Sequence, residues 1–203
     1  ATDAMYTAFN RSNFQQEIFE LYHDLITFGT AAMFIEEDEQ DLIKFSTRHI
    51  DEVYIAENDK GRIDTIYRRF KLSARAIVQK FGDKVSQDIL TMEKKDPYQE
   101  IEIIHAVYPR SDFDPKKKDK KNMPFESVYM EYKNKNELSV SGFKEFPFVV
   151  PRYLKASHEI YGRSPAMTAL PDVKMLNEMS KTTIKAAQKQ VDPPLLVPDD
   201  GFL

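Results

Sequence analysis

Hydrophobic residues recur at helical spacing near the N-terminal end of the chain. The apolar positions of this run are Phe14, Ile18, Leu21, Tyr22, Leu25 and Ile26. A repeat of three to four residues is typical of an amphipathic α-helix with one buried face. Ser12 and Gln15 match a capping box in front of the run, and Gly29 can provide the left-handed residue that often ends a helix. The pattern predicts a helix over residues 13–28.

A second and longer helical pattern follows Ser164 and Pro165. Serine is a preferred N-cap, and proline is favoured at the first helical position. The mainly apolar stripe behind them comprises Met167, Leu170, Val173, Leu176, Met179, Thr183 and Ala186. We predict the longest helix over residues 164–190, kinked or restarted at Pro171, because proline removes an amide and clashes with the preceding turn. We expect the β-rich middle of the chain to be contacted by Met167, Leu170, Leu176 and Met179.

Between these helices lie short runs rich in β-branched and aromatic residues, as in strands. The runs cover residues 31–36, 42–47, 53–57, 62–71, 100–108, 125–132 and 137–143. Asn-Asp-Lys-Gly at 58–61 indicates a hairpin, and Ser73 and Ser86 can cap short helices over 74–80 and 87–94. The sequence therefore predicts a one-domain α+β fold. Its antiparallel β-rich middle, residues 31–154, is flanked by an N-terminal amphipathic helix and a long C-terminal helix.

Composition narrows the classes of protein that remain. The chain has 203 residues and no cysteine, which excludes disulfides and thiolate metal sites and fits a reducing compartment. Its apolar runs fall short of the roughly 20 residues that cross a bilayer, so we expect no membrane partner. A net charge of −4 argues against tight, static DNA binding by the whole surface. The sequence lacks an initiator methionine and ends after a turn signal, so we expect a piece of a longer protein.

Residues 36–41 form an acidic run, from Glu36 to Asp41. Carboxylates can hold Mg²⁺ or Ca²⁺, and a metal-dependent, nucleic-acid-processing enzyme is one hypothesis for this run. Consecutive strand residues point to opposite faces, however, so they cannot converge on one ion without a specific loop. We therefore interpret the run as a solvated hairpin tip.

A basic run lies in the hydrophilic loop between the strands expected at 100–108 and 125–132. Its lysines are Lys116, Lys117, Lys118, Lys120 and Lys121. They can contact phosphate groups of DNA or an acidic partner, and a generic DNA-binding module is a further hypothesis. Without interleaved aromatic residues they provide no base readout. The favoured interpretation is a mobile loop kept extended by charge repulsion.

Motifs for catalysis, cofactors and metals are missing from the sequence. The chain contains no GxSxG nucleophile elbow, P-loop or dinucleotide fingerprint. The histidines have no zinc-binding spacing; they are His23, His49, His105 and His158. We therefore expect a non-enzymatic protein without a cofactor or metal ion. The 14 phenylalanines and 10 tyrosines fit a core that also extends into an oligomer interface.

Several blocks carry a family resemblance when taken together in order and spacing. They are residues 27–38, 61–70, 105–110, 142–143, 146–148, 151–153, 161–165, 169–172, 176–177 and 191–196, and their order and spacing cover nearly the whole chain. The most specific is Tyr-Gly-Arg-Ser-Pro at 161–165. This series resembles the head-to-tail connecting (portal) proteins of short-tailed bacteriophages. Tyr153 stands where tryptophan is more usual in that family, which affects only packing detail.

The resemblance implies a structural role. Portal subunits form a dodecameric ring at one vertex of the capsid, contact scaffolding and capsid proteins, dock the terminase large subunit, pass double-stranded DNA and bind the tail adaptor. It implies a virion protein assembled in the host cytoplasm. It also implies that this chain is the wing region, with the stem, clip and crown absent. Arg163 can then pair with an acidic group across a subunit boundary, although pairing within its own chain is equally open.

Overall fold

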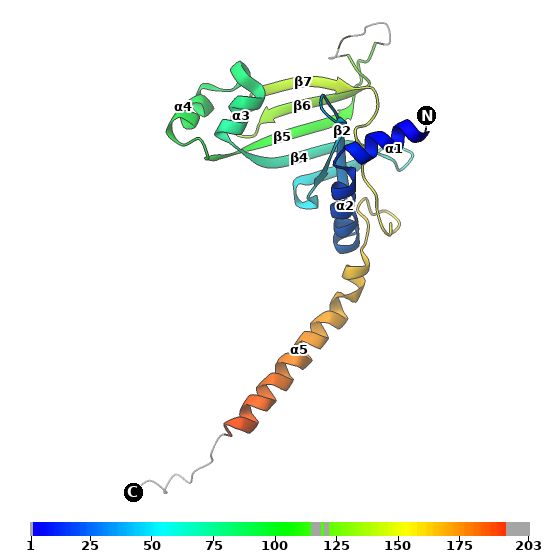
Figure 1. Cartoon of the computed structure of the whole chain (residues 1–203), viewed down its shortest axis with the longest axis vertical. Coiled ribbons are helices and arrows are strands. Elements are labelled where there is room, and N and C mark those ends of the chain that lie inside the picture. The colour runs from blue at the N-terminus through cyan, green and yellow to red at the C-terminus, as the bar shows by residue number, and fades with distance from the viewer. Residues whose placement is uncertain (1, 115–118, 120–121, 194–203) are drawn as a thin grey trace.

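The structure is a computed structural model that describes residues 2–114, 119 and 122–193 (Figure 1). Its helices are α1 (Thr2–Arg11), α2 (Phe14–Phe28), α3 (Ala74–Phe81), α4 (Gln87–Lys95) and α5 (Pro165–Val191), with short 3₁₀ helices at Ile50–Glu52 and Gly82–Lys84. Its strands are β1 (Ala32–Asp38), β2 (Leu42–Arg48), β3 (Val53–Glu57), β4 (Ile63–Ser73), β5 (Glu100–Pro109), β6 (Phe125–Glu131), β7 (Glu137–Phe143) and β8 (Phe148–Val149). This mixture of helices and antiparallel strands confirms the predicted α+β class.

The strands form two antiparallel sheets. The larger runs in the order β3-β4-β5-β6-β7, so each strand pairs with its neighbour in sequence, and the smaller has the order β2-β1-β8. Sequential antiparallel neighbours need only short connections. The β3–β4 hairpin forms around residues 58–61, as predicted: the Asn58 N–H donates to the Arg62 carbonyl at 2.9 Å.

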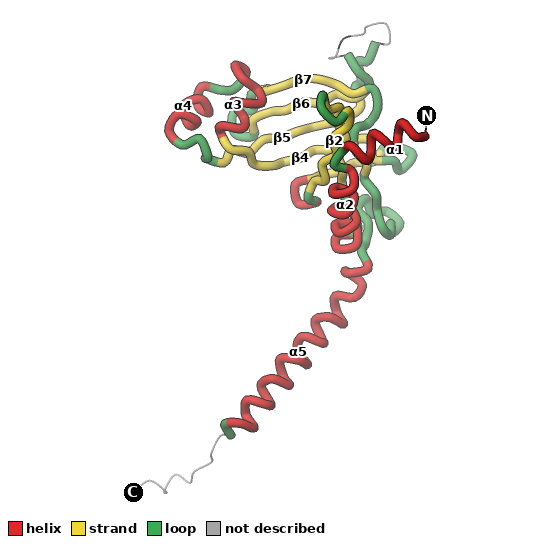
Figure 2. The backbone as a smooth tube through the Cα atoms, viewed as in Figure 1, coloured by secondary structure: helices red, strands yellow, loops and turns green. Residues whose placement is uncertain are grey.

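Three hydrophobic clusters hold these layers together. The first, between the two sheets, contains Ala32, Phe34, Val53, Ile55, Ile66, Val107 and Phe148. The second, between the larger sheet and the α3–α4 pair, contains Phe70, Ala74, Ile77, Val85, Ile89, Ile103 and Leu138. The third, between α2 and the outer face of the smaller sheet, contains Leu21, Ala31, Met33 and Phe45. Both the smaller sheet and the α3–α4 pair therefore cover one face of the larger sheet, side by side (Figure 2).

Side chains cap the outer edges of two edge strands. At the β2 edge, the Asn13 carboxamide bonds both the N–H (3.0 Å) and the carbonyl (2.8 Å) of Phe45, and the Glu17 carboxylate accepts from the Thr47 N–H. At the β3 edge, the Tyr161 hydroxyl accepts from the Ile55 N–H at 3.2 Å. Backbone groups at a sheet edge otherwise attract foreign strands. These side chains therefore block strand addition at those positions.

A buried carboxylate ties α4 to the larger sheet. Glu131 is 1% exposed and accepts from the N–H (2.9 Å) and hydroxyl (2.8 Å) of Ser86. The carboxamides of Asn134 and Asn136 donate to the same carboxylate at 3.2 Å. A buried charge is costly unless hydrogen bonds satisfy it. The Ser86 hydroxyl is thus used for Glu131 and makes no cap bond to α4, contrary to the capping role predicted for it.

The first predicted helix is confirmed, but its N-terminal signal was misread. α2 begins at Phe14 and ends at Gly29, whose φ of 77° and N–H bond to the Leu25 carbonyl match the predicted cap. Ser12 does not form the predicted capping box: the N-cap is Asn13, and the Ser12 hydroxyl accepts from the Phe14 N–H at 3.3 Å and donates to the Phe9 carbonyl at 2.9 Å. α1 was not among the helices predicted from the sequence. It is only ten residues long and buries none of its side chains.

The long C-terminal helix is confirmed, but its predicted packing is wrong. α5 runs from Pro165 to Val191 without a new start at Pro171, and it extends away from the sheets (Figure 1). None of its side chains is buried. The four residues expected to face the β-rich middle are all exposed: Met167, Leu170, Leu176 and Met179. An apolar stripe shows which side of a helix can be buried, but it does not say what covers that side.

Paired substitutions test this arrangement. Ile77→Ala should lower the free energy of unfolding by about 2–5 kcal/mol, because the fully buried side chain leaves a cavity. Leu176→Ala should change it by less than about 0.5 kcal/mol, since Leu176 is 58% exposed. Urea denaturation at low protein concentration measures both values. A loss above about 1.5 kcal/mol for Leu176→Ala would show that α5 packs onto the body of the protein.

Candidate functional site: the joint at the root of the long helix

Two of the sequence blocks meet where α5 leaves the body of the protein. Residues 27–30 join α2 to β1, and residues 162–165 begin α5. The Thr30 hydroxyl accepts from the Gly162 N–H at 2.7 Å, and the Ser164 hydroxyl donates to the Thr27 carbonyl at 2.8 Å. Thr30 and Ser164 are 1% and 2% exposed. These contacts, called the α5 joint below, fix the position of the first turn of the helix.

Two glycines allow the backbones to approach closely in the α5 joint. A Cβ on Gly29 would lie 2.5 Å from backbone atoms of residues 162–164, and a Cβ on Gly162 would lie 2.2 Å from the Gly29 carbonyl oxygen. Separations below 3.0 Å are sterically impossible without backbone movement. Gly29 also needs its left-handed φ of 77° to end α2. Glycine is therefore required at both positions for packing.

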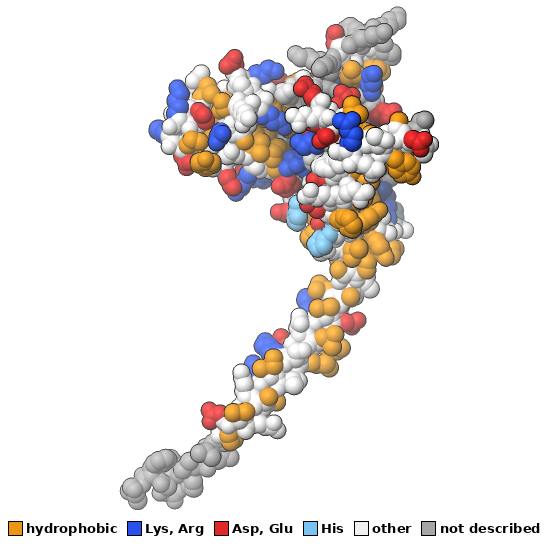
Figure 3. All heavy atoms as spheres, viewed as in Figure 1, with side chains coloured by type: hydrophobic (Ala, Val, Ile, Leu, Met, Phe, Trp, Pro, Cys, Tyr) orange, Lys and Arg blue, Asp and Glu red, His pale blue; other side chains and the backbone are white. Residues whose placement is uncertain are grey.

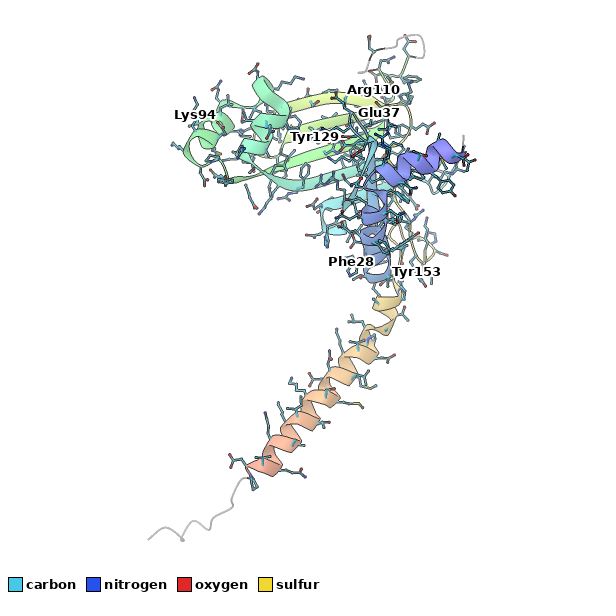
Figure 4. The ribbon with its side chains drawn as sticks, in the orientation of Figure 1. Phe28, Glu37, Lys94, Arg110, Tyr129 and Tyr153 are labelled. Carbon is cyan, nitrogen blue, oxygen red and sulfur yellow. The ribbon has the colours of Figure 1, made fainter. Side chains whose placement is uncertain are left out.

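Ser164 serves two elements at once. Its hydroxyl accepts from the Met167 N–H at 2.9 Å, which caps α5 as predicted, and it donates to the Thr27 carbonyl at the end of α2. Pro165 follows at the first helical position, where its missing N–H is harmless. Ser164 thus caps the start of α5 and also fixes this helix to α2. Figure 4 shows Phe28 and Tyr153 at this root of the helix.

A charged cluster holds the segment that leads into the α5 joint. The Glu57 carboxylate, at the end of β3, pairs with the Arg152 guanidinium and with the Lys155 ammonium. Arg152 also donates to the carbonyls of Gly61 (3.2 Å) and Ile160 (3.1 Å). Hydrogen bonds from Lys155 and Arg152 lower the pKa of Glu57 below its usual 4.5. This cluster connects the β3–β4 hairpin to residues 152–160.

The remaining sequence-predicted sites lie elsewhere. Arg163 is exposed and pairs with Glu159 of its own chain, Nε to Oε2 at 2.9 Å. Its predicted contact across a subunit boundary therefore stays a prediction. The basic run, comprising Lys116, Lys117, Lys118, Lys120 and Lys121, lies outside the described residues. The mobility expected for this run therefore stays a prediction.

The acidic run forms the β1–β2 hairpin and its turn. The Asp38 carboxylate accepts from the N–H groups of Gln40 (3.0 Å) and Asp41 (2.9 Å), and these bonds lower its pKa. Glu36 faces Lys44 across the hairpin at 3.8 Å. Within the described ranges, no three His, Cys, Asp or Glu side chains are grouped to hold a metal ion. Asp38 thus stabilises the turn, and Glu36 pairs across the hairpin.

The body of the protein leaves α5 uncovered, with no buried side chain along its length. Figure 3 shows hydrophobic side chains spread along the helix. The most exposed of these, each with a relative exposure of 47% or more, include Val173, Met175, Leu176, Met179 and Ile184. Charged residues recur along one side at Lys174, Glu178, Lys181, Lys185 and Lys189, and Asp172 lies on the other side, one turn before Leu176. No helix in the described part of the chain has the length and hydropathy of a membrane span.

The first prediction for the α5 joint concerns Gly162. Gly162→Ala should lower the free energy of unfolding by about 4 kcal/mol or more, because the new Cβ meets a backbone oxygen that cannot move aside. Gly82→Ala is the matched control: it has open space around it and adds only backbone strain of about 1–3 kcal/mol. Chemical denaturation of both variants gives the comparison. An equal or smaller loss at Gly162 would contradict the close approach.

The second prediction concerns acid. Because the pKa of Glu57 is lowered in the folded protein, its contribution to stability is complete above the ordinary value of 4.5 and is lost as the pH falls through the folded value. Glu57→Gln should therefore destabilise the protein at pH 7, and its difference from wild type should shrink toward pH 3. Thermal unfolding across this range measures the effect. Glu145→Gln, which removes an exposed carboxylate with no ion pair among the described residues, should show no such convergence.

Comparison with known proteins covers the whole chain. A family profile described as "Bacteriophage head to tail connecting protein" matches residues 1–203. The "Portal protein" of Salmonella phage epsilon15 is 37% identical over 199 residues, which is 96% of this chain and 36% of that protein. The "Probable portal protein" of Bordetella phage BPP-1 is 33% identical over 201 residues, which is 97% of this chain and 36% of that protein. The chain thus spans about a third of the length of these curated relatives.

The family resemblance carried by the sequence blocks is confirmed, because the family profile matches residues 1–203. On this match, the chain belongs to the bacteriophage head-to-tail connecting (portal) protein family.

Proposed function

We propose that the protein is a structural subunit of the phage portal ring at the unique capsid vertex, and that this chain is its wing region. Family membership and the names of the two relatives support the structural role. We assign the chain to the wing because the Gly-Arg-Ser-Pro block and α5 are expected to precede the stem, clip and crown. The full-length subunit is then expected to form a dodecameric ring. Its location is the virion, after assembly in the host cytoplasm.

The observation that carries the proposal is the exposure of α5. A helix of 27 residues is about 40 Å long, and here it has no buried side chain. Helices in water gain most of their stability from packing of an apolar face, and large exposed apolar surfaces mark sites of interaction. In a ring, each subunit offers one surface to the next. We propose that neighbouring subunits cover the apolar side of α5.

The α5 joint gives this helix a defined direction. Gly29 and Gly162 place two backbones in contact, and Ser164 bonds to α2 and α5 together. A ring closes only if every subunit presents its interface at the same angle. A close-packed joint at the root of an exposed helix meets this requirement better than a flexible linker does. We therefore propose that the joint sets the geometry of assembly.

The wider partners follow from the portal role. They are the terminase large subunit, the tail adaptor, scaffolding and capsid proteins, and the double-stranded DNA that passes through the ring. The net charge of −4 suits a subunit that DNA slides past. Arg163 remains a candidate contact between subunits, and the lysines of the basic run remain candidates for contact with DNA or an acidic partner.

The other hypotheses have less support. An enzyme built on residues 36–41 needs carboxylates that converge, whereas the Asp38 carboxylate is used by its own turn. A DNA-binding module would depend on the basic run alone. We therefore propose a protein without enzymatic activity.

A charge placed on the apolar side of α5 tests the proposal. In the full-length protein, Leu176→Asp should leave the fold intact, because the side chain is exposed, and should weaken ring assembly at least tenfold, because burying an unpaired carboxylate is costly. Negative-stain electron microscopy and sedimentation measure the assembly. Asn177→Asp is the matched control: it adds the same charge one residue on, about 100° around the helix and toward the charged side.

The outcomes separate the parts of the proposal. Rings from wild type and Asn177→Asp, but not from Leu176→Asp, would support α5 as an interface. Normal rings from both variants would remove α5 from the interface while leaving the portal assignment in place. A full-length wild-type protein that stops at a symmetric dimer would count against the portal role itself.

A further inference from the structure

A row of polar side chains crosses the middle of the larger sheet. Arg68, His105 and Tyr129 lie directly opposite one another on β4, β5 and β6, so all three point to the same face. The rows on either side of them are apolar on β4 and β5 and end on β6 in Ser127 and Glu131. Ile66 and Val107 belong to the cluster between the sheets, and Phe70 and Ile103 belong to the cluster under α3 and α4. The polar row therefore occupies the strip between the two covering layers.

The centre of this row is a rigid, uncharged aromatic pair. The rings of His105 and Tyr129 stack with centroids 3.9 Å apart and an angle of 4° between their planes. The His105 Nε2 and the Ser127 hydroxyl are hydrogen-bonded at 2.9 Å. Burial lowers the pKa of His105 to about 3, and the charges of nearby Lys80, Arg68 and Arg48 also lower it. At neutral pH the histidine thus adds no positive charge of its own.

Cationic side chains reach this pair from three elements. From α3, the Lys80 ammonium lies 4.5 Å from the centre of the Tyr129 ring. From β4, the Arg68 guanidinium lies 3.7 Å from the centre of the Phe70 ring, so it turns toward the α3 end of the sheet. From β2, Arg48 is the register partner of Ala32, which belongs to the cluster between the two sheets, so Arg48 points toward the larger sheet. Figure 4 shows Tyr129 in the strip between α3 and the β1–β2 hairpin.

The charges in this strip do not balance. Arg68 pairs with Glu52 at 2.8 Å, and Lys44 lies 3.8 Å from Glu36. Within the described ranges, Arg48 and Lys80 have no carboxylate within ion-pair distance. The two unpaired cations leave an excess of two positive charges beside a face that is partly shielded from water.

Electrostatics agree with this imbalance. Burial lowers the pKa of Lys80; Glu36 opposes that shift, while the charges of Arg48, Arg68 and Lys44 add to it. Burial and the charge of Arg48 also lower the pKa of Arg68. The cations therefore repel one another in a poorly solvated place, and a bound anion would relieve that repulsion.

We propose that Arg48, Arg68 and Lys80 form a binding site for a phosphate dianion, either free phosphate or a terminal phosphate monoester. A monoester carries a charge of about −1.5 to −2 at pH 7 and has three strong acceptor oxygens, which match two unpaired cations with several donors. Arginine presents a planar fork that suits phosphate oxygens. A single carboxylate, or a diester of the nucleic-acid backbone, has a charge near −1 and leaves one cation unmatched.

Titration with inorganic phosphate tests the site. Isothermal calorimetry on the intact protein at pH 7.5 and constant ionic strength should detect saturable binding of one phosphate per chain. Arg48→Gln and Lys80→Gln should each weaken that binding at least tenfold without lowering the thermal unfolding temperature of the ligand-free protein, because each removes a repelling charge. Lys94→Gln is the matched control, because Lys94 is an exposed lysine on α4, away from the strip (Figure 4). This variant should bind phosphate with the affinity of the wild-type protein.

Two further probes define the ligand. Dimethyl phosphate, a monoanion, should bind at least tenfold more weakly than inorganic phosphate. A nucleoside 5′-monophosphate that binds as inorganic phosphate does would identify the phosphate group as the whole ligand, and tighter binding would identify a terminal monoester on a larger molecule. The proposal fails if phosphate does not bind at millimolar concentration, if Lys94→Gln loses as much affinity as the site variants, or if dimethyl phosphate binds equally well. Ring assembly plays no part in these measurements, so their outcome is independent of the portal role.

Discussion

The contact between the backbones of Gly29 and Gly162 is the constraint on which the rest of the structure depends. It joins the end of α2, the start of β1 and the first turn of α5 at a separation that no side chain would permit. Ser164 and Thr30 then satisfy the polar groups that this contact buries. The two blocks are more than 130 residues apart in the sequence, and the folded β-rich middle between them brings them together. The direction of α5 is therefore a result of the complete fold.

The body of the protein satisfies its own surfaces with few exceptions. Asn13 and Tyr161 cap two strand edges that would otherwise attract other chains. Glu131 is buried with four donors around its carboxylate. Other features of the described residues remain uncovered, such as the exposed Phe19, Tyr22 and Ile26 of α2. The apolar side of α5 and the cationic strip at Arg48, Arg68 and Lys80 are two places where a partner or ligand can add stability.

The two features suit different kinds of recognition. α5 offers a long apolar surface, whose burial yields a roughly area-proportional and non-directional gain. The strip offers a few positive charges beside the stacked rings of Tyr129 and His105. The Lys80 ammonium, for example, lies 4.5 Å from the centre of the Tyr129 ring. Such a site favours a small ligand with matching charge and geometry. Assembly through α5 and binding at the strip can thus be altered separately by substitution.

Local sequence determined most of the secondary structure. Apolar periodicity, the Gly29 cap, the Asn58–Gly61 turn and the Ser164-Pro165 start are short-range signals, and each element they predicted is present. The family could also be read from the sequence blocks. Tertiary structure alone decided the packing of α5, the approach of Gly29 to Gly162, the use of Ser86 by Glu131 and the alignment of Arg68, His105 and Tyr129. Each of these depends on which residues meet across long stretches of chain, and periodicity carries no information about the partner that a face or a charge will find.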